Sequence, residues 1–459
     1  MDILPGFLSA LWTVGSFVVA LSIIVAVHEY GHYIVGRWSG IKAEVFSLGF
    51  GPKLVSRVDR RGTRWQIAAI PLGGYVKFLG DANAASAGTD AEAVAGLSPE
   101  ELRATMAGAP LWARAATVAA GPVFNFLLSI AVIAGLMLYS GTATDEPTVG
   151  DIVALPEGSG GLRAGDRIVA VEGLATPDYA ALNKAADAAP AATATLRYRV
   201  AREGGETEIE GPQLLPPRLA GVTPQSAAYA ADLRAGDVIT AVDGRPVWRF
   251  ETLREIVGAG DGAPLTLSIW RPEAVDEGAA GSPAALPGTR FEVTLTPKRT
   301  DLPLPEGGFE TRWLIGATGS FAFEPETRAT GLGEALTGAV ATTWTIVTTS
   351  LSGLWSMIAG EISSCNLHGA IGIAEGSAAA AKSGMPDFIW FIAMLSTAVG
   401  FLNLFPIPML DGGHLMFYTW EAVAGKPPSE KVFNGLMALG MALVFTMMIF
   451  GLSNDLFCP

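Results

Sequence analysis

The sequence predicts an α-helical membrane protein with four transmembrane helices and two inserted extracytoplasmic α/β domains that are mainly β. Three observations predict this fold class. Half of the 459 residues are hydrophobic and only 16% are charged, which is too apolar for a soluble chain of several domains. Four long stretches lack charge apart from a few chemically suggestive residues, and a twelve-residue segment occurs twice between the second and third stretches.

The four apolar stretches are long enough to cross a hydrocarbon layer of roughly 30 Å, which takes about 20 helical residues. They cover about 7–34, 115–139, 388–410 and 432–454. The first is not expected to be a cleaved signal peptide, because no basic residue precedes it and no small-residue cleavage site follows it. We therefore expect two pairs of transmembrane helices, in residues 1–140 and 387–459.

Basic residues predict the orientation of these spans. Lysine and arginine are absent before Arg37, whereas the loop from Arg37 to Arg114 is rich in both, so the positive-inside rule places this loop in the cytoplasm. Both termini and residues 141–330 are then extracytoplasmic. Residues 141–330 carry 27 acidic and 17 basic side chains, so we expect no nucleic-acid surface.

An internal repeat organises the extracytoplasmic region. Residues 162–173 recur 71 positions later as residues 233–244, with nine of twelve positions identical. In each copy a Gly-Asp turn precedes an alternating Ile/Val strand, and an acidic-Gly turn follows it. We expect one domain in 141–215 and a second in 216–300, with a loop between Pro272 and Gly288. A generic duplicated β-unit is the alternative interpretation.

Residues 335–360 are uncharged but rich in threonine and glycine, so a fifth span is an open alternative. We expect an interfacial or partly buried helix, within a connector at 301–386 that contains amphipathic or partly buried helices. Topology favours this interpretation. A fifth span would place Asp411, at the end of the third apolar stretch, on the opposite membrane face from His28.

The segment from His28 to His32, with Glu29 between them, is an HExxH motif at the end of the first apolar stretch. Residues four apart share one face of a helix, so both imidazoles can bind one zinc ion while Glu29 lies beside them as a general base. Ionisable groups at this depth are costly unless they are paired or bind metal. A structural pair of histidines is the alternative.

A hydrolytic zinc site needs a third protein ligand, and Asp411 is the best candidate. The two prolines at 406 and 408 interrupt the apolar stretch just before it, and irregular backbone at membrane depth implies a buried or wet site. The alternative interpretation is that Asp411 only caps a helix end and binds no metal. His414 is a rival ligand, or a residue that supports Asp411. We place His368 in a loop rather than in a second metal site.

Taken together, several motifs resemble the bacterial site-2 proteases, intramembrane zinc metalloproteases, of the regulator of sigma-E protease type with tandem PDZ domains. The resemblance covers nearly the whole chain. Its motifs are His28 to His32, Gly49 to Pro52, Pro71 to Phe78, Gly121 to Phe126, the repeated Leu-x-x-Gly-Asp core and Asn403 to Gly413.

The resemblance implies that Zn²⁺ is held by His28, His32 and Asp411, with Glu29 as general base. It implies that Asn403 holds substrate and that the fold includes a membrane-associated β-loop, at about 40–80, which dips into the membrane. The substrate would be a single-span membrane protein, an anti-sigma factor already trimmed by a first protease, cut in the bacterial inner membrane with the active site toward the cytoplasm. The PDZ domains would bind peptide or exclude bulky substrates. Gly369-Ala370-Ile371 departs from an expected Gly-Pro pair.

A transmembrane peptide bond is shielded within its helix, so the substrate must unwind and its backbone must pair with another strand. Gly73, Gly74, Tyr75 and Val76 could supply such an edge, although glycine-rich aromatic segments are commonly plain hairpins. Two other functions remain open. One is a catalytically silent, membrane-anchored PDZ receptor with a structural metal, and the other is a metal transporter.

Overall fold

The computed structural model describes residues 3–81, 94, 96–273, 286–304 and 309–458. The chain forms two compact units. The first, here called the helical unit, contains Met1–Leu136, Leu332–Trp355 and Leu367–Cys458. The second, here called the β unit, contains Met137–Gly331 and Ser356–Asn366.

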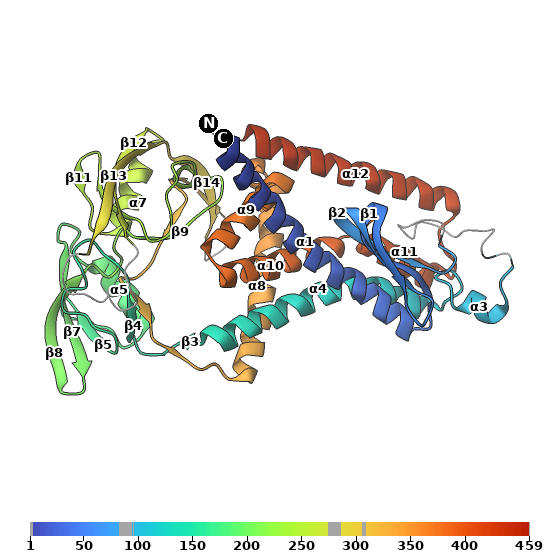
Figure 1. Ribbon diagram of the computed structural model, residues 1–459, viewed down its shortest axis with the longest axis horizontal. Coiled ribbons are helices and arrows are strands. Elements are labelled where there is room, and N and C mark those ends of the chain that lie inside the picture. The colour runs from blue at the N-terminus through green and yellow to red at the C-terminus, as the bar shows by residue number, and fades with distance from the viewer. Residues whose placement is uncertain (1–2, 82–93, 95, 274–285, 305–308, 459) are drawn as a thin grey trace. The chain divides into compact units, whose positions relative to one another are not determined.

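Long apolar helices dominate the helical unit (Figure 1). In the described part of the chain, four of them are long and apolar enough to cross a membrane, in agreement with the prediction. Among the described residues, the helices that begin in this unit are α1 (Ile3–Trp38), α3 (Pro99–Arg103), α4 (Leu111–Ser140), α8 (Leu332–Ile358), α9 (Ala370–Ser383), α10 (Met385–Asn403), α11 (Asp411–Ala424) and α12 (Glu430–Phe457). The four candidate spans are Ser9–Trp38, Leu111–Ser140, Met385–Asn403 and Glu430–Phe457.

The third span ends earlier than the sequence pattern predicts. The expected stretch was about 388–410, whereas α10 ends at Asn403 and α11 begins at Asp411. Pro406 and Pro408 lie in between, and a proline cannot donate the backbone hydrogen bond that a continuing helix needs. The apolar residues after Asn403 therefore form an irregular connection.

The uncharged stretch at 335–360 forms most of α8. This helix is not among the four candidate spans. Threonine hydroxyls of this helix donate hydrogen bonds to backbone carbonyls one turn earlier. Thr343, for example, donates to the carbonyl of Ala339 at 2.9 Å. The structure thus shows one long helix here, and its interfacial or partly buried position stays a prediction.

The predicted β-loop at about 40–80 forms the strands β1 (Ala43–Val58) and β2 (Arg64–Phe78), which pack on α1. The first part of β1 lies between two parts of β2, since Phe46 pairs with both Trp65 and Val76. Residues 74–78 therefore form an outer strand of this small sheet. Its buried side chains, Phe46 and Phe78 among them, share a core with Tyr33 of α1.

The β unit contains two modules with the same strand order, one for each copy of the repeat. The first sheet has the order β6-β5-β7-β8 and the second the order β11-β10-β12-β13. Their elements are β5 (Arg167–Val171), β6 (Leu174–Ala175), α5 (Tyr179–Ala188), β7 (Thr195–Arg202), β8 (Gly205–Pro212), β10 (Val238–Val242), β11 (Arg245–Pro246), α7 (Phe250–Ala259), β12 (Leu265–Pro272) and β13 (Gly288–Leu295). A register shift follows Ile168 in β5 and Ile239 in β10, which are equivalent positions of the repeat.

Residues 298–328 add strands where the sequence predicted only a connector with helices. β14 (Lys298–Pro303) pairs with β15 (Phe309–Leu314), and three short strands then pair backward along the chain. β16 (Ala317–Gly319) pairs with β9 (Leu219–Val222), β17 (Phe323–Pro325) with β4 (Val149–Ile152), and β18 (Thr327–Arg328) with β3 (Thr142–Ala143). A further short helix, α6 (Ala227–Ala230), precedes β10.

These pairings correct the predicted boundaries. The second module extends beyond residue 300, and the first contains a strand from beyond residue 320. Most of the loop expected between Pro272 and Gly288 falls on residues 274–285, outside the described residues.

Candidate metal centre

His28 and His32 lie on one face of α1, as their spacing requires. Their Nε2 atoms are 3.1 Å apart and their rings meet edge to face, with centroids 4.7 Å apart. His32 Nδ1 lies 2.9 Å from the carbonyl oxygen of Thr117, which can only accept a hydrogen bond. Nδ1 of His32 therefore carries the proton, and the lone pair of Nε2 is free for a metal ion.

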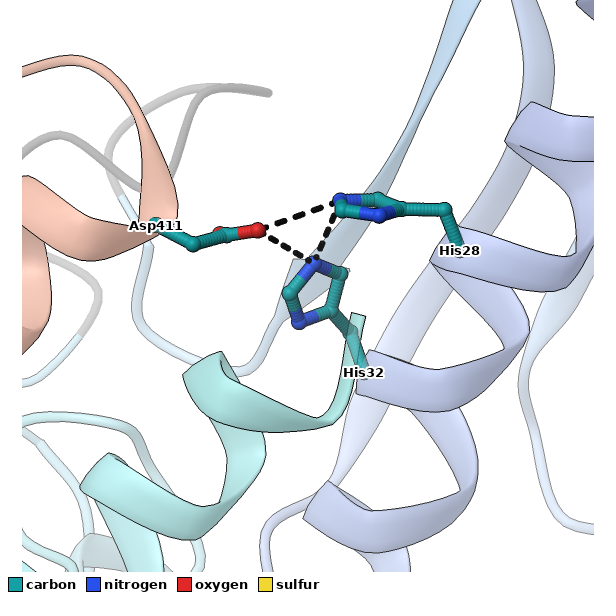
Figure 2. A group of neighbouring side chains, drawn as sticks. All are labelled: His28, His32 and Asp411. Atoms are coloured by element: carbon teal, nitrogen blue, oxygen red, sulfur yellow. Dashed lines mark hydrogen bonds and ion pairs between the residues drawn. The ribbon is translucent and has the colours of Figure 1, made fainter. Parts of the chain in front are cut away.

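Asp411 meets both imidazoles from the first turn of α11 (Figure 2). Its Oδ2 atom lies 3.1 Å from His28 Nε2 and 3.5 Å from His32 Nε2. The two histidine side chains are 12% exposed and that of Asp411 is 16% exposed, so the three groups are largely shielded from solvent. Residues far apart in sequence thus converge on one point.

The connection between α10 and α11 positions Asp411 by close backbone packing. A Cβ atom on Gly412 would lie 2.2 Å from the carbonyl oxygen of Phe405, and one on Gly413 would lie 2.4 Å from that of Ile407. Only glycine permits this approach. Met409 has a φ of 92°, a conformation that is strained for a residue with a side chain.

The three ligand atoms fit a zinc ion. Zinc bonds of about 2.0–2.1 Å in tetrahedral geometry separate the ligand atoms by about 3.3 Å, and the observed separations run from 3.1 to 3.5 Å. Asp411 Oδ2 is buried and faces the two imidazole Nε2 atoms, so its lone pairs point to the place that a metal ion would fill. Two imidazoles and one carboxylate leave a fourth position open, as in hydrolytic zinc sites.

The other two histidines lie outside this ligand group. His414 borders the same cavity one turn further along α11, but among the described residues the only group of three candidate ligands is His28, His32 and Asp411. His368 lies in the loop before α9, as predicted, and its Nδ1 is 3.9 Å from Asp455. Ala370 occupies the first position of α9, where proline is well tolerated, so the departure from a Gly-Pro pair leaves the helix start intact.

A cavity of about 260 Å³ opens beside the ligands. Four residues predicted to bind substrate border it, namely Gly74, Tyr75, Val76 and Asn403. Gly73 is not among its lining residues; a Cβ atom there would lie 2.6 Å from the ring of Phe50 instead. The lining that sequence analysis did not single out includes Phe78, Met106, Thr117, Val118, Met409 and Tyr418.

Glu29 lies between the histidines and the outer strand of the β1–β2 sheet. A Cβ atom on Gly74 would approach Glu29 Cγ to 2.9 Å, and the backbone of Val76 hydrogen-bonds to the Glu29 carboxylate. The strand and the carboxylate can touch because Gly74 has no side chain. A carboxylate, a metal-ligand set and a strand edge therefore share one cavity.

Apolar helices that carry a zinc-type ligand set and an adjacent carboxylate define the class as a membrane metalloenzyme. The family model of peptidase family M50 matches residues 16–447, and the chain belongs to this family. A Rhizobium meliloti (strain 1021) protein, provisionally named a zinc metalloprotease, is 34% identical over 97% of this chain and 96% of its own length.

The regulator of sigma-E protease RseP of Escherichia coli (strain K12) is 34% identical over 98% of this chain and 99% of its own length. An Agrobacterium fabrum (strain C58) protein, also provisionally named a zinc metalloprotease, is 32% identical over 96% of this chain and 94% of its own length. The chain is therefore a zinc metalloprotease of the site-2 protease family, and its apolar helices fit an inner-membrane protein.

Proposed function

We propose that His28, His32 and Asp411 hold the zinc ion of this protease and that Glu29 is its general base. The observation that carries this proposal is the convergence of three ligand atoms within 4.8 Å of one another, beside a cavity that also contains Glu29. A structural zinc site is normally closed by four protein ligands and needs no carboxylate beside it. The open position and Glu29 both favour catalysis.

The chain's own groups would act in a defined order. Zinc bound here would lower the pKa of a water molecule from about 15.7 toward about 7 and polarise the scissile carbonyl. Glu29 accepts the proton of the attacking water and then delivers it to the departing amine nitrogen. Asp411 compensates positive charge in a site whose other two ligands are neutral imidazoles.

The substrate would be the transmembrane segment of a single-span protein. Its backbone must leave the helix before cleavage, and freed N–H and C=O groups in a membrane need new partners. The outer strand at 74–78 offers such partners next to Glu29, with Gly74, Tyr75 and Val76 bordering the cavity. Asn403, the last residue of α10, would also hold the substrate. Gly73 would shape the strand without touching the substrate.

The name of the Escherichia coli relative points to regulation of a sigma factor. We extend this to the present chain by proposing a membrane-bound anti-sigma factor, trimmed beforehand by another protease, as its substrate. The two repeat modules would be extracytoplasmic PDZ domains that bind peptide or exclude bulky substrates, with both termini on the same side. The basic loop between the first two spans supports this orientation.

Glu29→Gln tests the proposal directly. The variant keeps the size of the side chain but cannot accept the proton, so we expect cleavage of a co-expressed single-span substrate to fall at least a hundredfold, in line with general-base contributions of about 10²–10⁴. Zinc content, measured by elemental analysis, should stay at the wild-type level. The matched control is Glu44→Gln in β1, whose carboxylate pairs with Lys77 at 3.2 Å.

Asp411→Ala completes the experiment and separates the candidate ligands. We expect this variant to lose zinc, whereas His414→Ala should keep it. Zinc retained in Asp411→Ala and lost in His414→Ala would transfer the ligand role to His414. Full cleavage by Glu29→Gln would overturn the catalytic role, and a receptor or transporter would show no dependence on Glu29 at all.

A further inference from the structure

Helix α4 contacts both histidines of the candidate metal centre at a glycine. A Cβ atom on Gly121 would lie 2.3 Å from His32 Nε2 and 2.8 Å from His28 Cε1. On the opposing helix, a Cβ atom on Gly31 would lie 2.5 Å from the carbonyl oxygen of Ala120. Small residues on both sides let two membrane helices approach this closely. The polar groups of α4 are thereby brought within reach of the imidazoles.

Each imidazole directs its second nitrogen at α4. His32 Nδ1 donates to the carbonyl oxygen of Thr117 at 2.9 Å, and His28 Nδ1 lies 3.2 Å from the side-chain amide of Asn125. Thr117 and Asn125 are both fully buried. Asn125 Oδ1 has no hydrogen-bond partner within the described part of the chain. A buried amide oxygen without a donor, beside a histidine nitrogen, calls for a physical explanation.

Metal binding supplies that explanation. A histidine that binds a metal through Nε2 carries its proton on Nδ1 and needs an acceptor there. Thr117 already gives His32 such an acceptor. A half-turn of the Asn125 amide exchanges its two ends and brings Oδ1 to the position 3.2 Å from His28 Nδ1. The amide then accepts the proton of His28, and the orphaned oxygen acquires its donor.

Pro122 belongs to the same arrangement. It lies inside α4 and is buried, and because it has no N–H, the carbonyl of Val118 loses its helical donor. The turn that contains Thr117 and Val118 is therefore held within α4 by one hydrogen bond fewer. Gly121, Pro122 and Asn125 thus combine close approach, a loosened turn and a side-chain acceptor within five residues of α4.

We propose that Asn125 is a positioning residue for the metal centre: its side-chain oxygen accepts the Nδ1 proton of His28, while Gly121 and the Thr117 carbonyl place the same helix against His32. This inference rests on the proposed zinc ligands. Asn125 acts through His28 and touches neither metal nor substrate.

The test measures zinc affinity of the detergent-solubilised full-length protein by competition with a chelator. Asn125→Leu keeps the size of the side chain without the acceptor, and we expect zinc affinity to fall about 10–100-fold, the usual cost of losing such an outer partner. Asn125→Asp restores an acceptor and should bind zinc within a few-fold of wild type. Ser129→Ala, one turn further along α4, removes packing hydrogen bonds to Asn125 and Ala393 carbonyls and serves as the matched control.

The outcomes separate this inference from the proposed function. Wild-type zinc affinity in Asn125→Leu, with zinc lost in His28→Ala, would overturn the role of Asn125 alone. Zinc retained in His28→Ala would overturn the proposed ligand set and the inference with it. Equal losses in Asn125→Leu and Ser129→Ala, or no recovery in Asn125→Asp, would reduce Asn125 to a packing residue and overturn the inference.

Discussion

The two modules of the β unit share a buried ion pair in the same place. In the first, Arg202 donates to Asp166 through Nε at 2.5 Å and Nη2 at 2.7 Å; in the second, Arg271 donates to Asp237 through the same two atoms at 2.7 Å each. The aspartates are 2% and 1% exposed. In each module these hydrogen bonds raise the pKa of the arginine.

The helix starts of the two modules differ. In the first, Asp178 caps α5 by accepting from the backbone N–H of Ala181 at 2.7 Å. Arg249 holds the equivalent position in the second and makes no cap hydrogen bond. It donates instead to the carbonyls of Ala189 at 2.6 Å and Asp187 at 3.1 Å, at the end of α5. The two modules share the buried charge pair, whereas the position that caps a helix in the first module makes a link between modules in the second.

The largest expected effect is from breaking the shared ion pair. Arg202→Ala or Arg271→Ala leaves a buried aspartate without its counter-charge, which typically costs about 3–5 kcal/mol. Because the arginines are 27% and 26% exposed, we expect the lower end, about 3 kcal/mol, in both modules. Hydrogen exchange of the full-length protein should then become about a hundredfold faster in the strands of the altered module.

Arg199→Ala is the control for this comparison. Arg199 lies on β7 near Arg202, is 46% exposed and pairs with Glu206 at 3.5 Å. An exposed pair of this kind contributes at most about 1 kcal/mol. A large effect of Arg202→Ala without one of Arg271→Ala would show that the two pairs are not energetically equivalent.

Arg249→Ala is expected to have an intermediate effect. It removes two charge-assisted hydrogen bonds to the end of α5 and leaves the start of α7 as it is, since no side-chain cap is lost. We expect a loss of about 1–2 kcal/mol, seen as faster exchange at the end of α5 in the first module. Exchange that changes only in α7 would contradict a role for Arg249 in linking the modules.

The smallest effect is expected at the cap. Asp178→Ala should cost about 1 kcal/mol and accelerate exchange of the α5 amides several-fold. The change should stay within the first module, because Asp178 bonds only to its own helix in the described contacts. Asp178→Asn preserves the capping oxygen and should behave like wild type; an equal loss in both variants would argue against capping.

Sequence patterns predicted the features that depend on composition and short spacing. The four apolar helices follow from hydropathy, and the shared face of His28 and His32 follows from helical periodicity. Pro406 and Pro408 interrupt the third apolar stretch, and this interruption indicated Asp411 as the residue that contacts the two histidines. Each of these inferences needs only a local rule, applied to a strong pattern.

Features that depend on pairing between distant segments were not predicted. Asn125 lies 97 positions from His28, and only the crossing of α1 and α4 at Gly31 and Gly121 brings them together. Arg202 lies outside the repeated twelve residues that contain its partner. Strands of two or three residues, such as those after residue 316, are too short to show an alternating pattern.

Because the last strands pair with strands that precede them in the sequence, the two modules are completed in a fixed order during synthesis. β17, at Phe323–Pro325, pairs with β4, at Val149–Ile152, and the second module lies between them in the sequence. A ribosome that adds about 5–20 residues per second needs roughly ten to thirty seconds to travel from one to the other. The module that emerges first is thus the last to be completed: β16 closes the second module before β17 becomes available. Until β17 has been synthesised, β4 lacks the strand with which it pairs in the folded first module.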